Sequence, residues 1–286
     1  MGTPLDALGV KLYAFPLTMV GIIFPFVVFL AVEAYWFWHN VSPGIVIVFC
    51  YIWVITLMAF LHGGLSDAGV LPLNINLPMD ENYNALPLEY YNTIPTRPPE
   101  DHNQHLSGIK FCESCFIWRP IRATHCSRCG VCVALMDHHC PWLGNCVGQR
   151  NYWYFISFLV LLNITIVYLM VMEFYKIGRL GVHGSHWAIF LGVYTVLAFM
   201  YTFLLLTFHI YIGLLGITTR EYLNMEMITG NPFKDVYEIP YYSPNPLGNL
   251  KKQWFRSRGW ALWRAREIIP DPLADNRTTQ IIVGGI

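Results

Sequence analysis

The stretch LMDHHCPWLGNC, residues 135–146, contains two histidines, two cysteines and an aspartate in close succession. Cysteine and histidine side chains bind zinc in proteins, and a cysteine beside a histidine can also act as a nucleophile that its neighbour activates. The stretch therefore indicates a metal site, a nucleophile site or both, and the surrounding sequence bears on which of these it is.

The composition around this stretch is that of a membrane protein. The chain has 286 residues, of which 55% are hydrophobic and 13% charged, whereas a soluble domain carries roughly 25% charged residues. About 20 apolar helical residues cross a bilayer, and four apolar runs approach or exceed this length, at residues 15–37, 44–61, 153–174 and 187–215. The first run is longer than the apolar core of a signal peptide and lacks a clear cleavage site, so we expect a retained span. The expected fold is an all-α membrane protein with four transmembrane helices.

The positive charges indicate the orientation of these spans. Of the 18 lysines and arginines, all but Lys176 and Arg179 lie before the first run, between the second and third runs, or after the fourth. Positive residues concentrate on the cytosolic side of a membrane, so both termini and the central loop are predicted to be cytosolic. Glu33 lies near the other end of the first run, where we expect it to reach the lumenal interface. The formal net charge of zero gives no reason to expect a nucleic-acid partner.

Seven of the eight cysteines lie between Cys112 and Cys146, in the predicted cytosolic loop. The cytosol is reducing, so metal binding or catalysis is favoured over disulfides. The Cys-x2-Cys spacings, together with His125, His138 and His139, are typical of tetrahedral zinc sites. Two closed zinc sites need eight of these ten candidate ligands, which leaves one cysteine and one histidine. The count alone leaves open which two remain, and whether they form a catalytic pair or are a stray thiol and imidazole beside two structural zinc sites.

Residues 137–140, Asp-His-His-Cys, resemble the signature of the DHHC protein S-acyltransferases, or palmitoyltransferases. The resemblance extends to RPIRATHC at residues 119–126, where Ile121 replaces a proline, and to PWLGNCVGQRNY at residues 141–152. It implies a division of the chain into transmembrane helices 1 and 2 (1–62), a cytosolic linker (63–110), a cysteine-rich zinc domain (111–152), transmembrane helices 3 and 4 (153–216) and a cytosolic tail (217–286).

The family pattern also assigns the ten candidate ligands. It implies two structural zinc ions, one bound by Cys112, Cys115, His125 and Cys132 and the other by Cys126, Cys129, His139 and Cys146. Cys140 is then the nucleophile, His138 its base, and Asp137 the group that orients the imidazole. By this resemblance, the opening stretch is both a metal site and a nucleophile site.

The reaction that the resemblance implies is the transfer of a long-chain acyl group between thiols. Cys140 takes a palmitoyl group from an acyl-CoA co-substrate, palmitoyl-CoA, and passes it to a membrane-proximal cysteine of a protein substrate at the lipid surface. Trp142 resembles the family residue that contacts the acyl chain, and coenzyme A phosphates are expected to bind Arg119, Arg122 and Arg128. The alternative for these arginines is the ordinary positive charge of a cytosolic loop.

The linker resembles one subgroup of the family. SDAGVLP at residues 66–72 and PLEYYN at residues 87–92 are similar to the fungal Ras palmitoyltransferase catalytic subunit and its counterparts, although Ala68 stands where a proline is usual. This resemblance implies residence in the endoplasmic reticulum or Golgi, a small accessory regulatory subunit, and Ras-type GTPases as substrates.

The tail carries the remaining family motifs, to which the resemblance gives supporting structural roles. They are Thr218, Thr219 and Glu221 of the TTxE motif, Asn231, Pro232 and Phe233 of an NPF element, and Asn249 beyond it. Residues 253–269 are predicted to form a basic amphipathic helix suited to a membrane surface or a partner.

Two other functions fit parts of the pattern. A membrane-anchored RING-like ubiquitin ligase would also present two zinc ions to the cytosol, but its ligand spacing differs and it has no use for a spare Cys–His pair. A non-catalytic scaffold of the same fold would not need residues 137–140 intact.

Overall fold

The computed structural model describes residues 4–72, 110–120, 122–229 and 244–256. Contacts divide the chain into two compact units. The helical unit comprises residues 1–64, 141–144 and 153–255, and the cysteine-rich unit comprises residues 65–140, 145–152 and 256–286.

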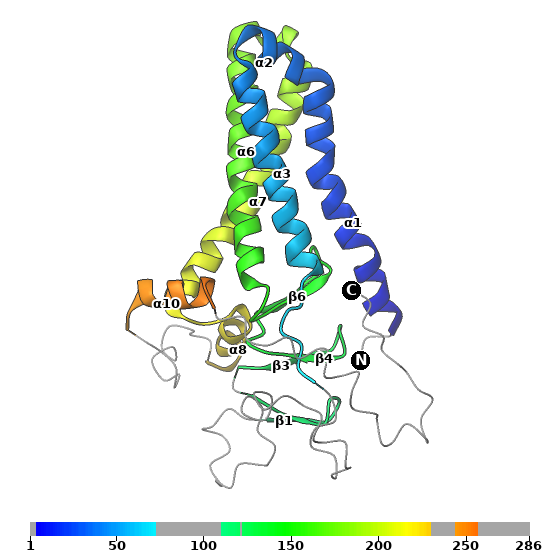
Figure 1. Ribbon diagram of the computed structural model, residues 1–286, viewed down its shortest axis with the longest axis vertical. Helices are drawn as coiled ribbons and strands as arrows, with labels where there is room; N and C mark the ends of the chain where they lie inside the picture. The colour runs from blue at the N-terminus through cyan, green and yellow to red at the C-terminus, as the bar shows by residue number, and fades with distance from the viewer. Residues whose placement is uncertain (1–3, 73–109, 121, 230–243, 257–286) are drawn as a thin grey trace. The chain divides into compact units, whose positions relative to one another are not determined.

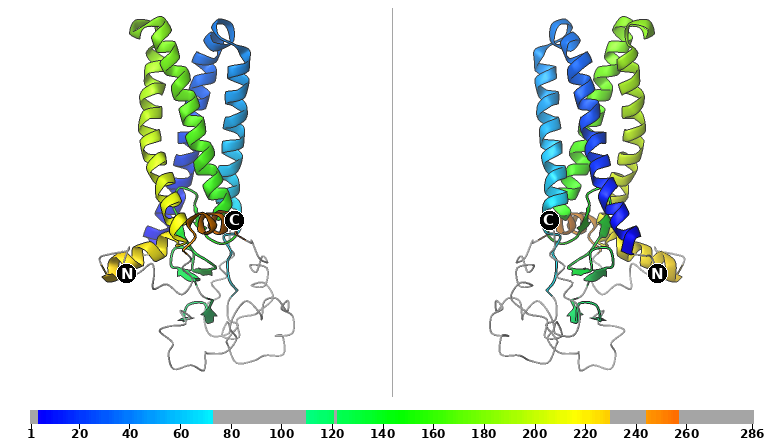
Figure 2. Two further views of the ribbon diagram at one scale, coloured as in Figure 1. Left: turned by 90° about the vertical axis from the view of Figure 1, so that its left-hand side faces the viewer. Right: turned by 90° about the vertical axis from the view of Figure 1, so that its right-hand side faces the viewer.

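Four long helical segments run side by side in the helical unit (Figures 1 and 2). The first, Ala14–Asn40, is built from α1 (Pro4–Val28), the π-helical η1 (Phe29–Glu33) and α2 (Ala34–Asn40), and the others are α3 (Pro43–Leu65), α6 (Tyr152–Leu180) and α7 (His186–Leu215). All four are long and apolar enough to cross a membrane, and each extends beyond the apolar run that predicted it. The predicted spans are therefore confirmed, and the chain is a multi-pass membrane protein.

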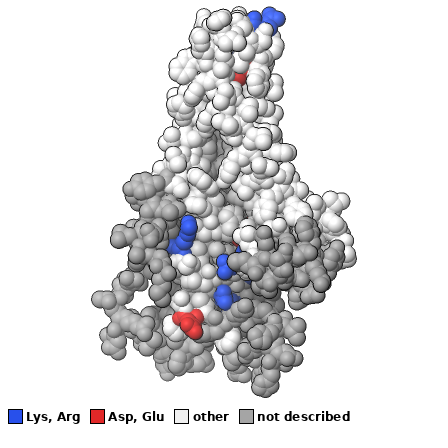
Figure 3. All heavy atoms as spheres, turned by 180° about the vertical axis from the view of Figure 1, so that it is seen from behind, with Lys and Arg blue, Asp and Glu red and all other residues white. Residues whose placement is uncertain are grey.

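The helical unit has an apolar exterior and an aromatic interior. On the face seen in Figure 3, the described surface of the long helices carries few charged side chains. Phe29, Phe37 and Phe49 are buried together, and the ring centroids of Phe29 and Phe49 are 4.5 Å apart. Because lipid is as apolar as these side chains, close packing and interhelical hydrogen bonds must hold the helices together.

Pro25 leaves one carbonyl of α1 without its helical partner, and another helix supplies the donor. A proline has no N–H, so it cannot donate to the carbonyl of Gly21, four residues earlier. The hydroxyl of Tyr194 on α7 donates to that carbonyl at 2.6 Å. The indole N–H of Trp53 on α3 donates to the adjacent carbonyl of Ile22 at 3.2 Å. The first span is thus attached to two of its neighbours.

Glu33, at the end of η1, lies in the interior of the helical unit. It is 1% exposed, and its Oε2 accepts a hydrogen bond from Nζ of Lys176 on α6 at 2.5 Å. Lys176 also lies 5.4 Å from the ring centroid of Trp36. The expectation that Glu33 reaches the lumenal interface is therefore wrong. A π-helical turn inserts an extra residue into the helix and turns the following side chains, and here a buried cation neutralises the carboxylate.

The described residues of the helical unit also form shorter helices. They are η3 (Val182–Gly184), α8 (Thr219–Thr229) and α10 (Pro246–Trp254), of which α10 packs against α7. Residues 253 and 254 are the last two of α10, and residues 255 and 256 are not helical, so the helix predicted over 253–269 is interrupted after Trp254. The remainder of that prediction lies outside the described residues.

In the described part of the cysteine-rich unit, the framework consists of three two-stranded antiparallel hairpins. They are β1 (Lys110–Cys112) with β2 (Ile117–Arg119), β3 (Thr124–Cys126) with β4 (Val131–Val133), and β5 (His138–Cys140) with β6 (Asn145–Val147). The expectation of an all-α fold is right for the membrane spans but missed these strands. Among the described residues, the apolar core beneath them is small, with Ala68, Val131, Val133 and Met136 among its buried members. A unit with so little apolar core is of the kind that metal binding stabilises.

Candidate active site and metal clusters

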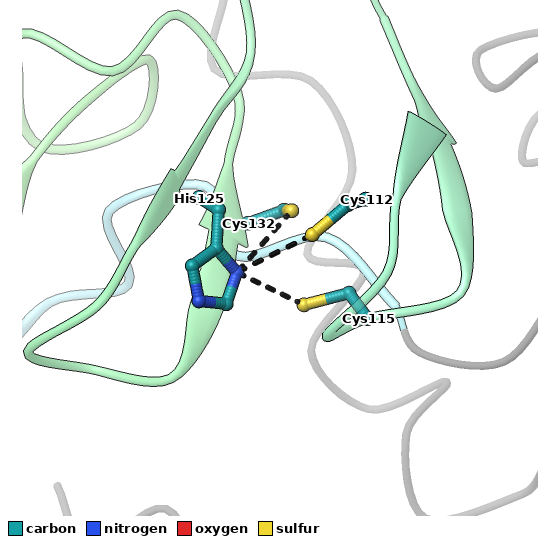
Figure 4. Close-up of side chains that lie close together, drawn as sticks. All are labelled: Cys112, Cys115, His125 and Cys132. Carbon is teal, nitrogen blue, oxygen red and sulfur yellow. Dashed lines mark hydrogen bonds between the residues drawn. The ribbon is translucent and has the colours of Figure 1, made fainter. Parts of the chain in front are cut away.

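The first metal cluster joins the first two hairpins. Cys112 ends β1 and Cys115 lies in the turn after it, while His125 and Cys132 face each other across β3 and β4. The Nδ1 atom of His125 lies 3.5 Å from the Sγ of Cys112, 3.4 Å from that of Cys115 and 3.8 Å from that of Cys132. Figure 4 shows the three sulfur atoms gathered around this nitrogen.

The second cluster repeats the same construction one hairpin later. Cys126 ends β3 and Cys129 lies in the following turn, while His139 and Cys146 face each other across β5 and β6. The Nδ1 atom of His139 lies 3.6 Å from the Sγ of Cys126, 3.3 Å from that of Cys129 and 3.6 Å from that of Cys146. Gly130, with φ +66°, allows the tight turn after Cys129.

The alternation of side chains along a strand explains how one hairpin serves both clusters. Successive residues of a strand point to opposite faces. His125 and Cys126 are neighbours in β3, so one side chain reaches the first cluster and the other reaches the second. The middle hairpin thereby links the two metal clusters.

Both clusters fit zinc by ligand type and by spacing. A tetrahedral zinc ion with bonds of about 2.3 Å to sulfur and 2.0–2.1 Å to nitrogen holds these atoms about 3.6 Å apart. The observed separations of nitrogen from sulfur range from 3.3 to 3.8 Å. Hydrogen bonding with neighbouring thiols lowers the pKa of Cys115 to about 5 and raises that of Cys132. The thiols therefore compete for the deprotonated state, and a bound cation would let all of them be thiolates.

Asp137, His138 and Cys140 remain outside the two clusters. Asp137 is 0% exposed, and its Oδ2 lies 2.7 Å from Nδ1 of His138. His138 and Cys140 are two residues apart in β5, so they share one face of the strand, and His139 between them faces the second metal cluster. The strand thus separates the predicted catalytic side chains from the metal ligand.

The environment of His138 favours its charged form. Burial lowers its pKa, but hydrogen bonds with Asp137 and with the Cys140 thiol outweigh burial and raise the pKa to about 10. A carboxylate that accepts from Nδ1 directs proton exchange with a nucleophile to the other ring nitrogen, Nε2. The arrangement can therefore move a proton to and from a thiol.

The predicted supporting residues of the tail have local roles in the helical unit. Thr218 and Glu221 form a capping box at the start of α8: the Thr218 N–H donates to Oε2 of Glu221 at 2.7 Å, and the Glu221 N–H donates to Oγ1 of Thr218 at 3.2 Å. Thr219 is the first residue of α8. Asn249 donates through Nδ2 to the carbonyl of Leu214, near the end of α7, at 3.2 Å. Gln253, for which no sequence motif indicated a role, donates through Nε2 to the carbonyl of Ile217 at 2.9 Å.

The predicted acyl and coenzyme A contacts differ in their exposure. Trp142 is 44% exposed, and Arg128 is exposed in the turn between β3 and β4. Arg119 and Arg122 are half-buried, and Arg122 has a left-handed backbone with φ 68°. Asn231, Pro232 and Phe233 lie outside the described residues.

Comparison with known proteins gives consistent matches. A family model described as DHHC palmitoyltransferase matches residues 105–226. The chain is 35% identical over 256 residues to Palmitoyltransferase ERF2 of Kluyveromyces lactis, an alignment that covers 84% of this chain and 69% of that protein. It is 36% identical to Palmitoyltransferase ERF2 of Debaryomyces hansenii, with 86% and 71% covered. With the Saccharomyces cerevisiae protein of the same name the identity is 42%, with 72% and 58% covered.

Proposed function

The chain belongs to the DHHC palmitoyltransferase family, and on this premise we propose that Cys140 carries the acyl group in transit. The enzyme is a protein S-palmitoyltransferase. The observation that supports the assignment of roles is the placement of Asp137, His138 and Cys140 together, outside two complete sets of metal ligands.

The reaction consists of two thioester exchanges. With its proton already held by His138, the Cys140 sulfur attacks the carbonyl carbon of palmitoyl-CoA, and the coenzyme A sulfur leaves with that proton. The sulfur of a substrate cysteine then attacks the acyl-Cys140 thioester as His138 takes the proton of that cysteine, and the Cys140 sulfur leaves beside the protonated His138. Asp137 holds the imidazole through Nδ1 and stabilises its charged form. One thioester replaces another at each step, so no energy source is needed.

The two metal clusters have a structural part in this proposal. Cys112, Cys115, His125 and Cys132 would hold one zinc ion, and Cys126, Cys129, His139 and Cys146 would hold the other. Bound zinc contributes folding free energy to a unit with little apolar core. His139 and Cys146 lie on the two strands of the hairpin that carries Cys140, so their ligation restrains both strands.

The membrane spans suit the donor that we propose. A palmitoyl chain has roughly 14 methylene groups, and burial of each is worth about 0.8 kcal/mol, so roughly 11 kcal/mol favours keeping the chain in an apolar environment. Trp142 would contact this chain, and Arg119, Arg122 and Arg128 would bind the coenzyme A phosphates. With both termini and the cysteine-rich unit in the cytosol, the reaction takes place where acyl-CoA is available.

The resemblance to the subgroup of the fungal Ras palmitoyltransferase catalytic subunit extends the proposal to the substrate, the location and a partner. The substrates are membrane-associated proteins with a membrane-proximal cysteine, Ras-type GTPases among them, and the enzyme resides in the endoplasmic reticulum or Golgi. A small accessory subunit stabilises the acyl-enzyme without supplying catalytic residues. If the purified chain alone holds its acyl-enzyme as long as the chain in native membranes does, the accessory subunit is not needed.

Labelling the purified protein with radioactive palmitoyl-CoA tests the role of Cys140. The native chain and the Cys50→Ala control, which alters a cysteine of α3, should both acquire a label that hydroxylamine removes. Cys140→Ser should acquire none while retaining two zinc ions. A hydroxylamine-labile label of native intensity on Cys140→Ser would place the acyl group on another residue.

A further inference from the structure

We infer that residues 66–71 form a brace that positions Cys140, and that Asn145 is the positioning residue through which the brace acts. The inference rests on the proposed role of Cys140 as the nucleophile. Three sets of contacts within the cysteine-rich unit support this inference. They join the brace to β4, to the segment after β6, and to Asn145 in β6.

The brace pairs with the middle hairpin like an additional strand. Val70 forms an antiparallel bridge with Val133 of β4. The Leu71 N–H donates to the carbonyl of Cys132 at 2.8 Å, and the Ala134 N–H donates to the carbonyl of Gly69 at 2.8 Å. Cys132 is a ligand of the first metal cluster, so this pairing ties the brace to one end of the metal framework.

Asp67 fixes the turn of the brace and joins it to the segment after β6. Its Oδ1 accepts hydrogen bonds from the N–H groups of Gly69 at 2.8 Å and Val70 at 3.0 Å, which is the geometry of an Asx turn. Its Oδ2 lies 2.9 Å from Nε of Arg150, and the Arg150 N–H donates to the carbonyl of Ala68 at 3.3 Å. The brace is therefore attached to the chain on both sides of the catalytic hairpin.

Asn145 connects the brace to the nucleophile. In the β5–β6 register, Asn145 is the residue directly opposite Cys140. Its Nδ2 donates to the carbonyl of Ser66 at 2.8 Å. The next pair along the hairpin, His139 and Cys146, is restrained by its metal cluster, whereas the Cys140 pair lies beyond the ligands. A two-stranded hairpin is marginally stable by itself, so the Asn145 amide supplies the restraint that the metal ligands do not give to this pair.

Removal of the Asn145 amide should therefore lower the rate of acyl-enzyme formation without loss of the zinc ions. A displacement of about 1 Å at a reacting atom can cost on the order of a hundredfold in rate. The Asn145 side chain contacts a backbone carbonyl and is not a metal ligand, so its removal leaves all eight ligands in place. Asn145→Asp keeps the shape of the side chain but replaces the donor with an acceptor that repels the Ser66 carbonyl. Asn145→Gln keeps an amide donor on a longer stem.

The test measures acyl-enzyme formation on the full-length chain with labelled palmitoyl-CoA over a range of concentrations. Asn145→Asp and Asn145→Ala should lower kcat by at least tenfold with KM within twofold of native, and Asn145→Gln should recover part of the loss. Both slow variants should retain two zinc ions and the same number of alkylatable Cys140 thiols. Asn224→Ala, which alters an exposed asparagine of α8, is the matched control and should equal the native chain.

Three results would overturn the positioning role. They are a native kcat in Asn145→Asp, a loss of zinc that accounts for the loss of activity, and an equal loss in Asn145→Gln and Asn145→Ala. Failure of the proposed function is distinguishable from these, because in that case the native chain itself forms no hydroxylamine-labile acyl-enzyme at Cys140.

Discussion

His139 and Cys146 face each other across the β5–β6 hairpin, with Nδ1 of the histidine 3.6 Å from Sγ of the cysteine. His138, the preceding residue in β5, has its Nδ1 against the buried carboxylate of Asp137 instead. Two adjacent histidines therefore have different tasks because a strand turns successive side chains to opposite faces.

The adjacent histidines provide the first prediction. His138→Ala should retain two zinc ions and form the acyl-enzyme about 10² to 10⁴ times more slowly, which is the usual contribution of general acid–base catalysis. His139→Ala should lose one zinc ion and with it the folded hairpin. Metal analysis and single-turnover labelling of both variants measure these effects. Retention of two zinc ions in His139→Ala together with loss of one in His138→Ala would reverse the assignment.

Removal of a metal ligand should cost stability and not rate alone. Cys126→Ser should bind one zinc ion fewer and unfold at a lower temperature, because a structural zinc site contributes folding free energy directly. Cys50→Ser makes the same chemical change in α3, which contributes no ligand to either metal cluster, and should keep the native zinc content. Zinc content and thermal unfolding in detergent measure the difference. Equal unfolding temperatures for the two variants would contradict a structural metal at Cys126.

The pH dependence of stability should report the contact between Asp137 and His138. The pKa of His138 is raised to about 10, above the value of about 6.5 for an unperturbed histidine. The folded state then binds the proton more tightly than the unfolded state, so the contact stabilises the fold fully below about pH 6.5. This stabilisation is lost as the pH rises through about 10. The free energy of unfolding of the native chain should therefore fall as the pH rises from about 6.5 to about 10. The fall should be smaller for Asp137→Asn. Parallel pH profiles for the two chains would show that the contact adds nothing.

The sequence predicted the features that follow from local composition and spacing. The four spans could be predicted because a helix that crosses lipid needs a long apolar run. The ten candidate ligands could be identified because zinc sites have short cysteine spacings. The division of those candidates into ligands and catalytic residues needed the family resemblance, because counting treats His138 and His139 alike. Three-residue strands are too short to display a period, so the hairpins were missed.

Local sequence patterns could not predict contacts between residues far apart in the chain. The Asn145–Ser66 hydrogen bond joins residues 79 positions apart, and the Glu33–Lys176 pair joins residues 143 positions apart. Glu33 is the last residue of a π-helical segment, and no residue type signals such a segment. The tertiary structure, and not the local pattern, decides the role of each of these side chains.

Gly148 should be intolerant of a side chain because the brace approaches it closely. A Cβ atom at this position would lie 2.5 Å from the Ala68 carbonyl oxygen and 2.6 Å from Cγ1 of Val133. Gly148→Ala should therefore destabilise the cysteine-rich unit by about 1–3 kcal/mol, as overpacking of a close-packed site does. Gly178→Ala in α6 is the matched control, since a Cβ there meets nothing within 4 Å. The control should leave stability unchanged or raise it by about 0.5–1 kcal/mol through helix propensity. Native stability of Gly148→Ala in denaturant unfolding would contradict the observed approach of the brace.

The buried pair of Glu33 and Lys176 should behave as a single unit. Removing one partner of a buried ion pair leaves an uncompensated charge and costs about 3–5 kcal/mol. Lys176→Met should cost more than Glu33→Gln, because the Glu33 side chain that it leaves without a cation is 1% exposed, whereas the Lys176 side chain that Glu33→Gln leaves unpaired is 9% exposed. The double variant Glu33→Leu with Lys176→Met removes both charges of the pair and should be more stable than Lys176→Met alone. Unfolding free energies in mixed micelles complete the double-mutant cycle. Additive losses in the double variant would mean that the two side chains stabilise the helices independently.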